Sequence, residues 1–359
     1  MKNKLLLLSI LAFGLLTVGA GCVSFSTGTN TSGPVGMFLS TDRGENWQPI
    51  VSWPTVEGVK SIATAEVYRM VEDPNDAKAM YLATRNVGLF YTYNDGKSWQ
   101  RSEGPFSTGY VYSVAVHPLD KCIIYATNGN KVYRTDDCSR SWQEVYRESR
   151  SDTMIVSLAF SYSSSHHIFL GESNGDLLQS FDSGISWSVA NRFGDRLTQI
   201  ITHPADSNLV YIIFQTKGLM RSLDGGYTWE DISIKMKAYS GGLDYRRFVI
   251  DKKDPNKFYW VSAYGVLVSN DKGNTWQALE LLTPPGSAKI YGFAVNPQND
   301  KEIYYTATID NRSTFYKSMD GGKNWITKKL PSAQIPVLLR VHPDNPSWIY
   351  LGFAMPPKQ

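Results

Sequence analysis

The sequence predicts an all-β fold, and three observations carry this prediction. Aromatic residues make up 13% of the 359 residues, with 21 Tyr, 15 Phe and 10 Trp, and they favour strands. The 29 Gly and 17 Pro residues favour short strands that are joined by tight turns. An octet of the form Ser/Thr-x-Asp-x-Gly-x-x-Trp also recurs seven times. With 42% hydrophobic and 19% charged residues, the composition excludes a disordered chain and a multi-span membrane protein.

The first residues have the pattern of an export signal. A short positive head precedes an apolar run over residues 5–16, which is too short to span a bilayer as a stable helix. Small residues then precede Cys22, and this resembles the lipobox at which bacterial lipoproteins are cleaved and acylated, although Gly19 stands where that family usually has Leu. We expect residues 1–22 to be a signal peptide and Cys22 to carry lipid, which predicts an extracytoplasmic, membrane-anchored lipoprotein. Secretion after ordinary cleavage is the alternative.

Two further regions follow the leader. Residues 23–36 are polar and rich in Gly, Ser and Thr, and we expect them to be a flexible linker. Residues 37–359 contain all seven octets and are expected to form one repeat domain.

The octets are spaced like the blades of a propeller. Successive tryptophans lie 52, 43, 45, 42, 47 and 49 residues apart, close to the length of one four-stranded blade. Two copies depart from the pattern, with Asn94 in place of Asp and Ser139 in place of Gly. The Asp and Trp positions of the seven octets are occupied by Asp42 and Trp47, Asn94 and Trp99, Asp137 and Trp142, Asp182 and Trp187, Asp224 and Trp229, Asp271 and Trp276, and Asp320 and Trp325.

The chemistry of the octet is structural. An Asp side chain can accept hydrogen bonds from nearby backbone N–H groups, Gly supplies a positive φ, and Trp can bury beneath the hairpin. The octet resembles the Asp-box, or BNR, repeat of sialidases, sortilins, xyloglucanases and photosystem II assembly-factor propellers. This resemblance implies a β-propeller over nearly the whole expected mature chain. It leaves function open, because these families include both hydrolases and non-enzymatic binders.

The strands around each octet predict seven four-stranded blades. Pairs of strands joined by a Pro-containing turn precede the octets, as in residues 111–127 and 197–214, and we expect them to be inner strands A and B. Strand C leads into the octet and strand D follows it. The first octet has only residues 36–40 before it, whereas residues 337–353 have no octet after them. The N-terminal C and D strands should therefore pair with the C-terminal A and B strands and close the ring.

Cys122 and Cys138 are the cysteines that remain once Cys22 is set aside. Cys122 begins an expected B strand, and Cys138 lies in the octet turn that ends the adjacent C strand. Counting back from the hairpin turn near residues 128–129 brings both to the same end of neighbouring strands, so we expect a disulfide in an exported protein. Two unrelated thiols are the alternative.

Neither the net charge nor the histidine residues indicate a binding partner. Lys and Arg number 36 against 33 Asp and Glu, so the net charge gives no case for a nucleic-acid surface. His117, His203 and His342 each precede Pro at the same expected A-to-B turn, which makes them turn residues. We expect no metal site and no cofactor.

The patterns that suggest hydrolysis have structural interpretations. The G-x-S-x-G motif around Ser173 falls in an expected β-hairpin, whereas a serine hydrolase needs a strand-to-helix elbow. The Arg-Ile-Pro element of sialidases is absent, and Arg85 or Asn86 stands where the similar xyloglucanase segment has a catalytic Asp. We therefore expect no catalytic residue among these patterns.

The B-to-C turns differ from blade to blade, and variation among equivalent loops is how a repeat scaffold can build a specific surface. The candidate binding residues on these turns are Arg85, Asn86, Glu172, Asp176, Lys217, Tyr264, Asp310 and Arg312. The longest turn, which contains Asp310 and Arg312, is the strongest candidate.

These observations predict a monomeric, non-enzymatic scaffold that binds a protein or a glycan on the face opposite the octets. A secreted glycoside hydrolase of the xyloglucanase or sialidase type is the alternative. Two carboxylates about 5 to 10 Å apart across the channel mouth would favour the hydrolase, whereas an uncharged or aromatic mouth would favour the scaffold.

Overall fold

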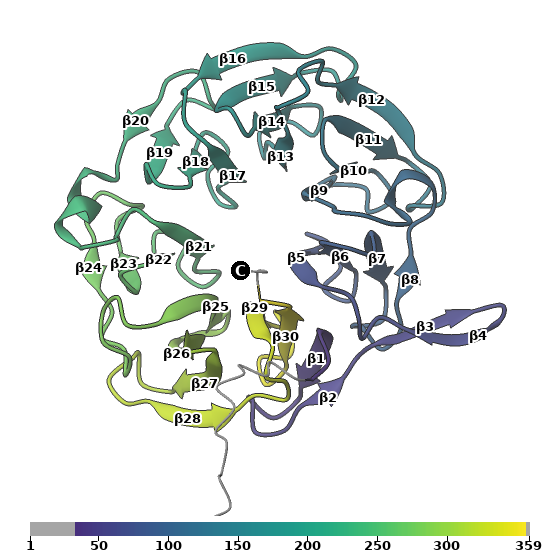
Figure 1. Ribbon diagram of the computed structural model, residues 1–359. Coiled ribbons are helices and arrows are strands. Elements are labelled where there is room, and N and C mark those ends of the chain that lie inside the picture. The colour runs from purple at the N-terminus through teal and green to yellow at the C-terminus, as the bar shows by residue number, and fades with distance from the viewer. Residues whose placement is uncertain (1–32, 357–359) are drawn as a thin grey trace, which may run out of the picture. The chain divides into compact units, whose positions relative to one another are not determined.

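The computed structural model describes residues 33–356, which belong to one compact unit, Thr31–Gln359. Seven four-stranded antiparallel sheets are arranged around a common axis (Figure 1). The prediction of an all-β, seven-bladed propeller is therefore confirmed. The expected signal peptide, Cys22 and most of the expected linker lie outside the described residues.

Six blades are formed by consecutive strands, listed here from the axis outwards. Blades 1 to 3 contain β5(Val67–Glu72), β6(Met80–Thr84), β7(Leu89–Thr92) and β8(Gln100–Arg101); β9(Ser113–Val116), β10(Ile124–Thr127), β11(Lys131–Thr135) and β12(Gln143–Arg147); and β13(Ile155–Phe160), β14(Ile168–Glu172), β15(Asp176–Ser180) and β16(Ser188–Arg192). Blades 4 to 6 contain β17(Leu197–Thr202), β18(Val210–Phe214), β19(Leu219–Ser222) and β20(Glu230–Asp231); β21(Tyr245–Ile250), β22(Phe258–Ser262), β23(Val266–Ser269) and β24(Gln277–Ala278); and β25(Lys289–Asn296), β26(Asn299–Ile309), β27(Arg312–Ser318) and β28(Ile326–Lys329).

The seventh blade joins the two ends of the described chain. Its strand order from the axis is β29(Ile335–Val341), β30(Ile349–Ala354), β1(Gly36–Ser40) and β2(Gln48–Pro49). β1 pairs with β30 in an antiparallel register that runs from Gly36 opposite Phe353 to Ser40 opposite Ile349. The predicted closure of the ring by N-terminal C and D strands and C-terminal A and B strands is thus confirmed. β1 begins one residue before the expected start of the domain.

The octets form the turns between strands C and D, and their hydrogen bonds repeat in all seven blades. In the fifth octet, Ser222 Oγ accepts a bond of 2.8 Å from Gly226 N–H and donates one of 2.7 Å to Asp224. Asp224 also accepts bonds from the backbone and hydroxyl of Thr228, which lower the pKa of this carboxyl to about 2. Gly226 has a φ of 100°, and a Cβ there would lie 2.8 Å from the Phe169 ring of blade 3. The hydrogen bonds of the Ser or Thr hydroxyl and of the Asp or Asn side chain are therefore made within one turn, which packs closely on the preceding blade.

We predict that Ser222→Ala destabilises the ring. Ser222 is fully buried, and its removal leaves the buried Gly226 N–H unpaired, so the free energy of unfolding should fall by about 1 to 3 kcal/mol. Ser222→Thr is the matched control, because Thr92 and Thr135 donate and accept the same bonds in their own octets. Urea denaturation measures both variants. An Ala variant with the wild-type midpoint would contradict the structural role of the hydroxyl.

The octet tryptophans also join neighbouring blades, which the sequence analysis did not anticipate. Trp99 is fully buried and donates a 2.8 Å bond from Nε1 to the Ile50 carbonyl, which follows the outer strand of blade 7. Trp142 donates a 2.8 Å bond to Ser102 Oγ, just beyond blade 1. Each of these side chains therefore links its own turn to the blade before it.

Two hairpins depart from the regular blade. β3(Ser52–Thr55) and β4(Gly58–Ser61) form a two-stranded hairpin that projects from the ring between blades 7 and 1 (Figure 1). This hairpin was not predicted from the sequence, although the hairpin accounts for the longest spacing between octet tryptophans, that from Trp47 to Trp99. In blade 6, the longest B-to-C turn is an extended hairpin whose tip residues Asp310 and Asn311 have φ values of 46° and 61°.

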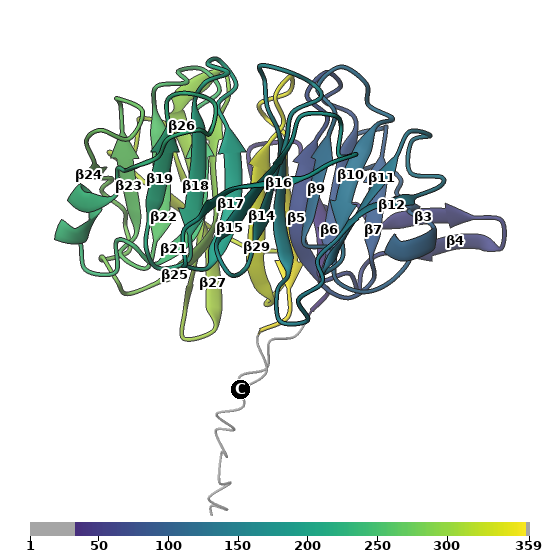
Figure 2. The same ribbon diagram turned by 90° about the horizontal axis from the view of Figure 1, so that it is seen from above.

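The propeller has two distinct faces. We call the face with the A-to-B turns and the octets the octet face, and the face with the B-to-C turns and the D-to-A connections the loop face. Both ends of the described chain lie on the loop face, because β1 starts there and β30 ends there (Figure 2). The helical elements in residues 33–356 are the short η1(Gly104–Phe106) and η2(Ile234–Ala238), and no helix in this range is long and apolar enough to cross a membrane.

Candidate functional site

The seven inner strands line a central channel. Its cavity has a volume of about 860 Å³ and receives residues from β5, β9, β13, β17, β21, β25 and β29. Because strand A starts at the loop face, the first residues of each inner strand lie near that mouth. The lining therefore joins side chains that are far apart in the sequence.

The lining of the channel is strongly cationic. It contains Arg69, Arg85, Arg196, Arg246, Arg247, Arg340 and Lys252, against the single carboxylate of Glu72. The seven cations and one carboxylate give the lining a formal net charge of +6. The whole chain has a net charge of +3, so all residues outside the lining together carry −3. The small net charge that the sequence reports therefore conceals a concentration of positive charge at one place.

Two of these arginines bond to a blade that is not adjacent to their own. Arg69 of blade 1 donates a 2.9 Å bond to the Thr198 carbonyl of blade 4. Arg247 of blade 5 donates bonds of 2.7 Å to the Tyr291 carbonyl and 2.6 Å to the Val337 carbonyl. Burial lowers the pKa of Arg247 to about 10, so its guanidinium still carries a positive charge at neutral pH. Both guanidinium groups are held in place by backbone carbonyl groups, and no carboxylate neutralises their positive charge within residues 33–356.

The lining carboxylate is already paired. Lys252 Nζ lies 2.8 Å from Glu72 Oε2, near the octet face. Burial raises the pKa of Glu72, but the positive charges of Arg340 and Lys252 outweigh it and hold that pKa below its usual value. Within residues 33–356, none of the six lining arginines has a carboxylate within ion-pair distance.

Tyrosine rings accompany the arginines near the loop face. Tyr68 and Tyr110 have ring centroids 5.0 Å apart, and Tyr110 lies 4.2 Å from Tyr112. The Arg69 and Arg85 guanidinium groups lie 5.0 and 5.8 Å from the Tyr68 ring centroid. Arg246 lies 4.9 Å from the Tyr291 ring in the same way. The mouth is therefore aromatic and cationic.

The residues predicted for the binding face do not form one site. Arg85 lines the channel. Asn86 instead holds its own turn, because its side chain bonds the Glu66 N–H and the Thr64 carbonyl. Lys217 is exposed, and Tyr264 packs on Tyr239.

Asp310 and Arg312 are exposed at the tip of the β26–β27 hairpin. This hairpin belongs to blade 6 and ends on the loop face, as the sequence analysis expected for the longest turn.

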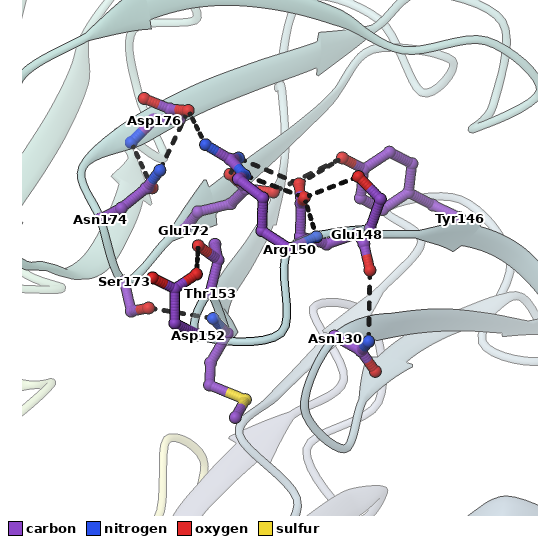
Figure 3. A network of polar contacts seen from close by, with 12 residues as sticks. Asn130, Tyr146, Glu148, Arg150, Asp152, Thr153, Glu172, Ser173, Asn174 and Asp176 are labelled. Carbon is purple, nitrogen blue, oxygen red and sulfur yellow. Dashed lines mark hydrogen bonds and ion pairs between the residues drawn. The ribbon is translucent and has the colours of Figure 1, made fainter.

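Glu172 and Asp176 belong to a buried polar network between blades 2 and 3 (Figure 3). The side chains of Glu148, Glu172 and Asp176 are 6%, 0% and 8% exposed. Arg150 covers them and makes ion pairs of 2.9, 2.6 and 2.9 Å with the three carboxylates. Glu172 and Asp176, which the sequence placed among the candidate binding residues, are thus covered by Arg150 and paired with it.

The two glutamates of this network titrate differently. Burial and a hydrogen bond with the Glu148 carboxylate raise the pKa of Glu172 to about 8. Hydrogen bonds from Arg150 lower the pKa of Glu148. The Tyr146 hydroxyl shares its one proton between the two glutamates and lies 3.3 Å from Glu148 Oε2 and 3.4 Å from Glu172 Oε1. At neutral pH the pair therefore holds one proton, on Glu172.

The other sequence motifs have structural surroundings. His342 Nε2 lies 3.2 Å from Asp95, and His203 Nε2 lies 2.7 Å from the Pro255 carbonyl. Among residues 33–356, no group of three His, Cys, Asp or Glu side chains is arranged to hold a metal ion. Ser173 lies in the turn between β14 and β15, where its hydroxyl accepts a 2.9 Å bond from Met154 N–H.

Cys122 and Cys138 are joined as a disulfide, with their Cα atoms 3.9 Å apart. The bond links the start of strand B to the octet turn of blade 2.

Sequence reasoning missed most of the channel arginines, although a signal was present. Arg69, Arg247 and Arg340 lie within strands that the pattern assigns to the innermost position, where a charged residue either faces the channel or is buried. The expected site was placed on the variable turns instead.

Comparison with known proteins agrees with this architecture. The family model described as Sortilin-Vps10 (Sortilin, neurotensin receptor 3) matches residues 36–174. Xyloglucanase Xgh74A of Acetivibrio thermocellus is 23% identical over 318 residues, which cover 78% of this chain and 34% of that protein. Vacuolar protein sorting/targeting protein 10 of Schizosaccharomyces japonicus is 34% identical over 83 residues, 23% of this chain and 6% of that protein. The chain thus spans about a third of the length of the xyloglucanase it matches.

Solved structures share the fold. The GH74 enzyme of Niastella koreensis has a TM-score of 0.65 at 17% identity, covering 80% of this chain and 51% of that chain. YCF48 of Cyanidioschyzon merolae has a TM-score of 0.59 at 10% identity, covering 80% and 96%. YCF48 bound to D1 peptide has a TM-score of 0.60 at 14% identity, covering 81% and 94%. The chain is a seven-bladed β-propeller similar to the sortilin, xyloglucanase and YCF48 propellers.

Proposed function

We propose that this protein is an exported, lipid-anchored scaffold that binds a protein or a glycan and catalyses no reaction. The observation that carries this proposal is the composition of the channel lining. Glu72 is its single carboxylate, and Lys252 holds that carboxylate in an ion pair. Glycoside hydrolysis of the usual kind needs two carboxylates on either side of the bond that is cleaved.

The comparisons are compatible with both partner classes. One similar propeller is YCF48 bound to D1 peptide, and other relatives are named as xyloglucanases. Both ends of the described chain emerge on the loop face, where the Tyr and Arg residues of the channel mouth also lie. A lipid at Cys22 would therefore tether the protein from its binding side. An intact mass that leaves Cys22 unmodified would remove the anchor from this proposal.

The second candidate function is a glycoside hydrolase that uses Glu148 and Glu172. The pair combines a carboxyl group with a raised pKa and one with a lowered pKa, which could act as general acid and general base. The two groups are hydrogen-bonded to each other, however, and so lie closer than the roughly 5 to 10 Å that glycoside hydrolysis uses. Both side chains are also at most 6% exposed and contact Arg150, so a sugar cannot reach them in this conformation. The geometry therefore favours the scaffold.

Incubation of the purified protein with xyloglucan, β-glucan and sialyllactose tests the proposal. We expect no release of reducing ends or sialic acid, and we expect the protein to capture a partner from detergent extracts of its native membranes. Turnover that Glu172→Gln abolishes, while the melting temperature is kept, would establish the hydrolase instead. The corresponding control is Glu144→Gln, an exposed carboxylate on β12 that is paired with Arg147.

A further inference from the structure

We propose that the channel mouth binds an acidic oligosaccharide, whose carboxylates pair with the lining arginines and whose sugar rings pack on the lining tyrosines. This inference rests on the proposed function and names the ligand class of the same protein. Its site is the channel, not the turns on which the sequence analysis placed the binding residues.

The arginines of the channel have unused capacity for an anion. The Nε atoms of Arg85 and Arg246 are buried and have no hydrogen-bond partner within residues 33–356. The same is true of Arg340, which lies deeper in the channel, toward Glu72 and the octet face. Buried donors without partners are costly, and a carboxylate that accepts two bonds from one guanidinium group would satisfy them. Since the rest of the chain carries −3, the field of the molecule also directs an anion toward the channel.

The tyrosines supply the apolar part of the recognition. Tyr68 and Tyr291 line the cavity, and each has a guanidinium group within 6 Å of its ring centroid. Tyr68 and Tyr291 are partly exposed, and a guanidinium group lies over each ring. A sugar that carries a carboxylate would pack on the ring surface left open while its carboxylate reaches that guanidinium group. The cavity of about 860 Å³ has the size of a small-molecule site and is large enough for a short oligosaccharide.

An acidic peptide is the competing ligand, and the backbone of the channel disfavours it. A peptide that adds to a sheet edge needs free carbonyl and N–H groups along that edge. The carbonyl groups of Thr198, Tyr291 and Val337 on three inner strands already accept bonds from Arg69 and Arg247. A ligand in the channel therefore meets mainly side chains, and it finds few free backbone groups with which a peptide could form a strand.

The test is isothermal titration calorimetry of the full mature chain with tetragalacturonate. Its fully methyl-esterified form is the matched neutral ligand, and hexaglutamate is the peptide ligand. The variants are Arg246→Gln, which removes one cation of the mouth, and Tyr291→Leu, which removes one ring. Arg101→Gln is the control, because Arg101 is exposed on the outer strand β8. Thermal melts verify that each variant is folded.

We expect tetragalacturonate to bind, and the methyl ester to bind at least tenfold more weakly. Arg246→Gln and an increase in salt from 20 to 300 mM should each weaken binding about tenfold, whereas Arg101→Gln should change it less than twofold. Tyr291→Leu should weaken the tetragalacturonate complex at least fivefold. No binding of tetragalacturonate, or equal binding of its ester, would overturn the inference and leave the scaffold standing. Tighter binding of hexaglutamate, unaffected by Tyr291→Leu, would assign the channel to a peptide, whereas turnover of a sugar would defeat the proposed function itself.

Discussion

A chain that ends at Gln334 is expected to lose the cooperative unfolding of the whole ring. The deletion removes β29 and β30, so β1 loses its partner over Gly36–Ser40 and exposes an edge. Leu339, Ile349 and Leu351 are fully buried, and each contributes about 1.5 to 3 kcal/mol by burial. Because seven large apolar side chains of these two strands are buried, the loss is about 10 to 20 kcal/mol, comparable to or larger than the roughly 5 to 15 kcal/mol that holds a domain folded.

The two neighbouring blades would also lose packing. Leu338 and Tyr350 belong to a core cluster with Met70 and Trp99 of blade 1, and Leu339 packs with Tyr304 and Phe315 of blade 6. Circular dichroism melts and gel filtration measure the effect. The control is a chain that ends at Pro356, which keeps every described residue and should melt like the wild type. A shortened chain that remains monomeric and keeps the wild-type melting temperature would refute closure of the ring by the C-terminal strands.

The sequence predicts this architecture because the octet is a local and repeated signal. Residues such as Ser222, Asp224 and Gly226 bond within one turn, so the turn can be recognised without knowledge of the rest of the molecule. The spacing of the turns then gives the number of blades, and the unmatched strands at both ends give the closure. The β3–β4 hairpin escaped prediction because it contains no octet and appears only as an excess of length.

The site is harder to predict because it depends on contacts between blades. Arg69 and Thr198 are 129 residues apart and meet only when the ring closes. The net charge of +3 averages over the whole chain and hides the positive channel. Glu172 and Asp176 have the sequence of ordinary turn residues, and it is Arg150, from the connection between blades 2 and 3, that covers them.

Replacing Arg150 with Gln is expected to destabilise the protein by about 2 to 3 kcal/mol. Removal of one partner from a buried ion pair leaves uncompensated charge, which typically costs about 3 to 5 kcal/mol. The Arg150 side chain is 45% exposed, so solvent screening reduces that cost. Arg192→Gln is the matched control, because Arg192 lies 3.8 Å from Asp176 but is 71% exposed, and its loss should change the free energy of unfolding by less than about 0.5 kcal/mol.

The pH dependence distinguishes this network from a simple loss of packing. In the folded protein the pKa of Glu172 is about 8, raised from 4.5, so the folded state retains a proton that the unfolded state releases above pH 4.5. Stability due to Glu172 is therefore present below pH 4.5 and declines as the pH rises to about 8. In the Arg150→Gln variant, Glu148 and Asp176 also lose the cation that they pair with. The free energy of unfolding of this variant should therefore fall more steeply between pH 5 and 9 than that of the wild type.

Glu172→Gln should remove the Glu172 part of this dependence, since an amide carries no proton that titrates in this range. The double variant Arg150→Gln, Glu172→Gln should also regain part of the stability lost at pH 9, because one of the three uncovered carboxylates is gone. Melting temperatures of the four proteins at pH 5, 7 and 9 form a double-mutant cycle that isolates the Arg150–Glu172 interaction. Additive effects at pH 9, with no rescue by the second substitution, would mean that Arg150 stabilises the ring through packing of its stem and not through its charge.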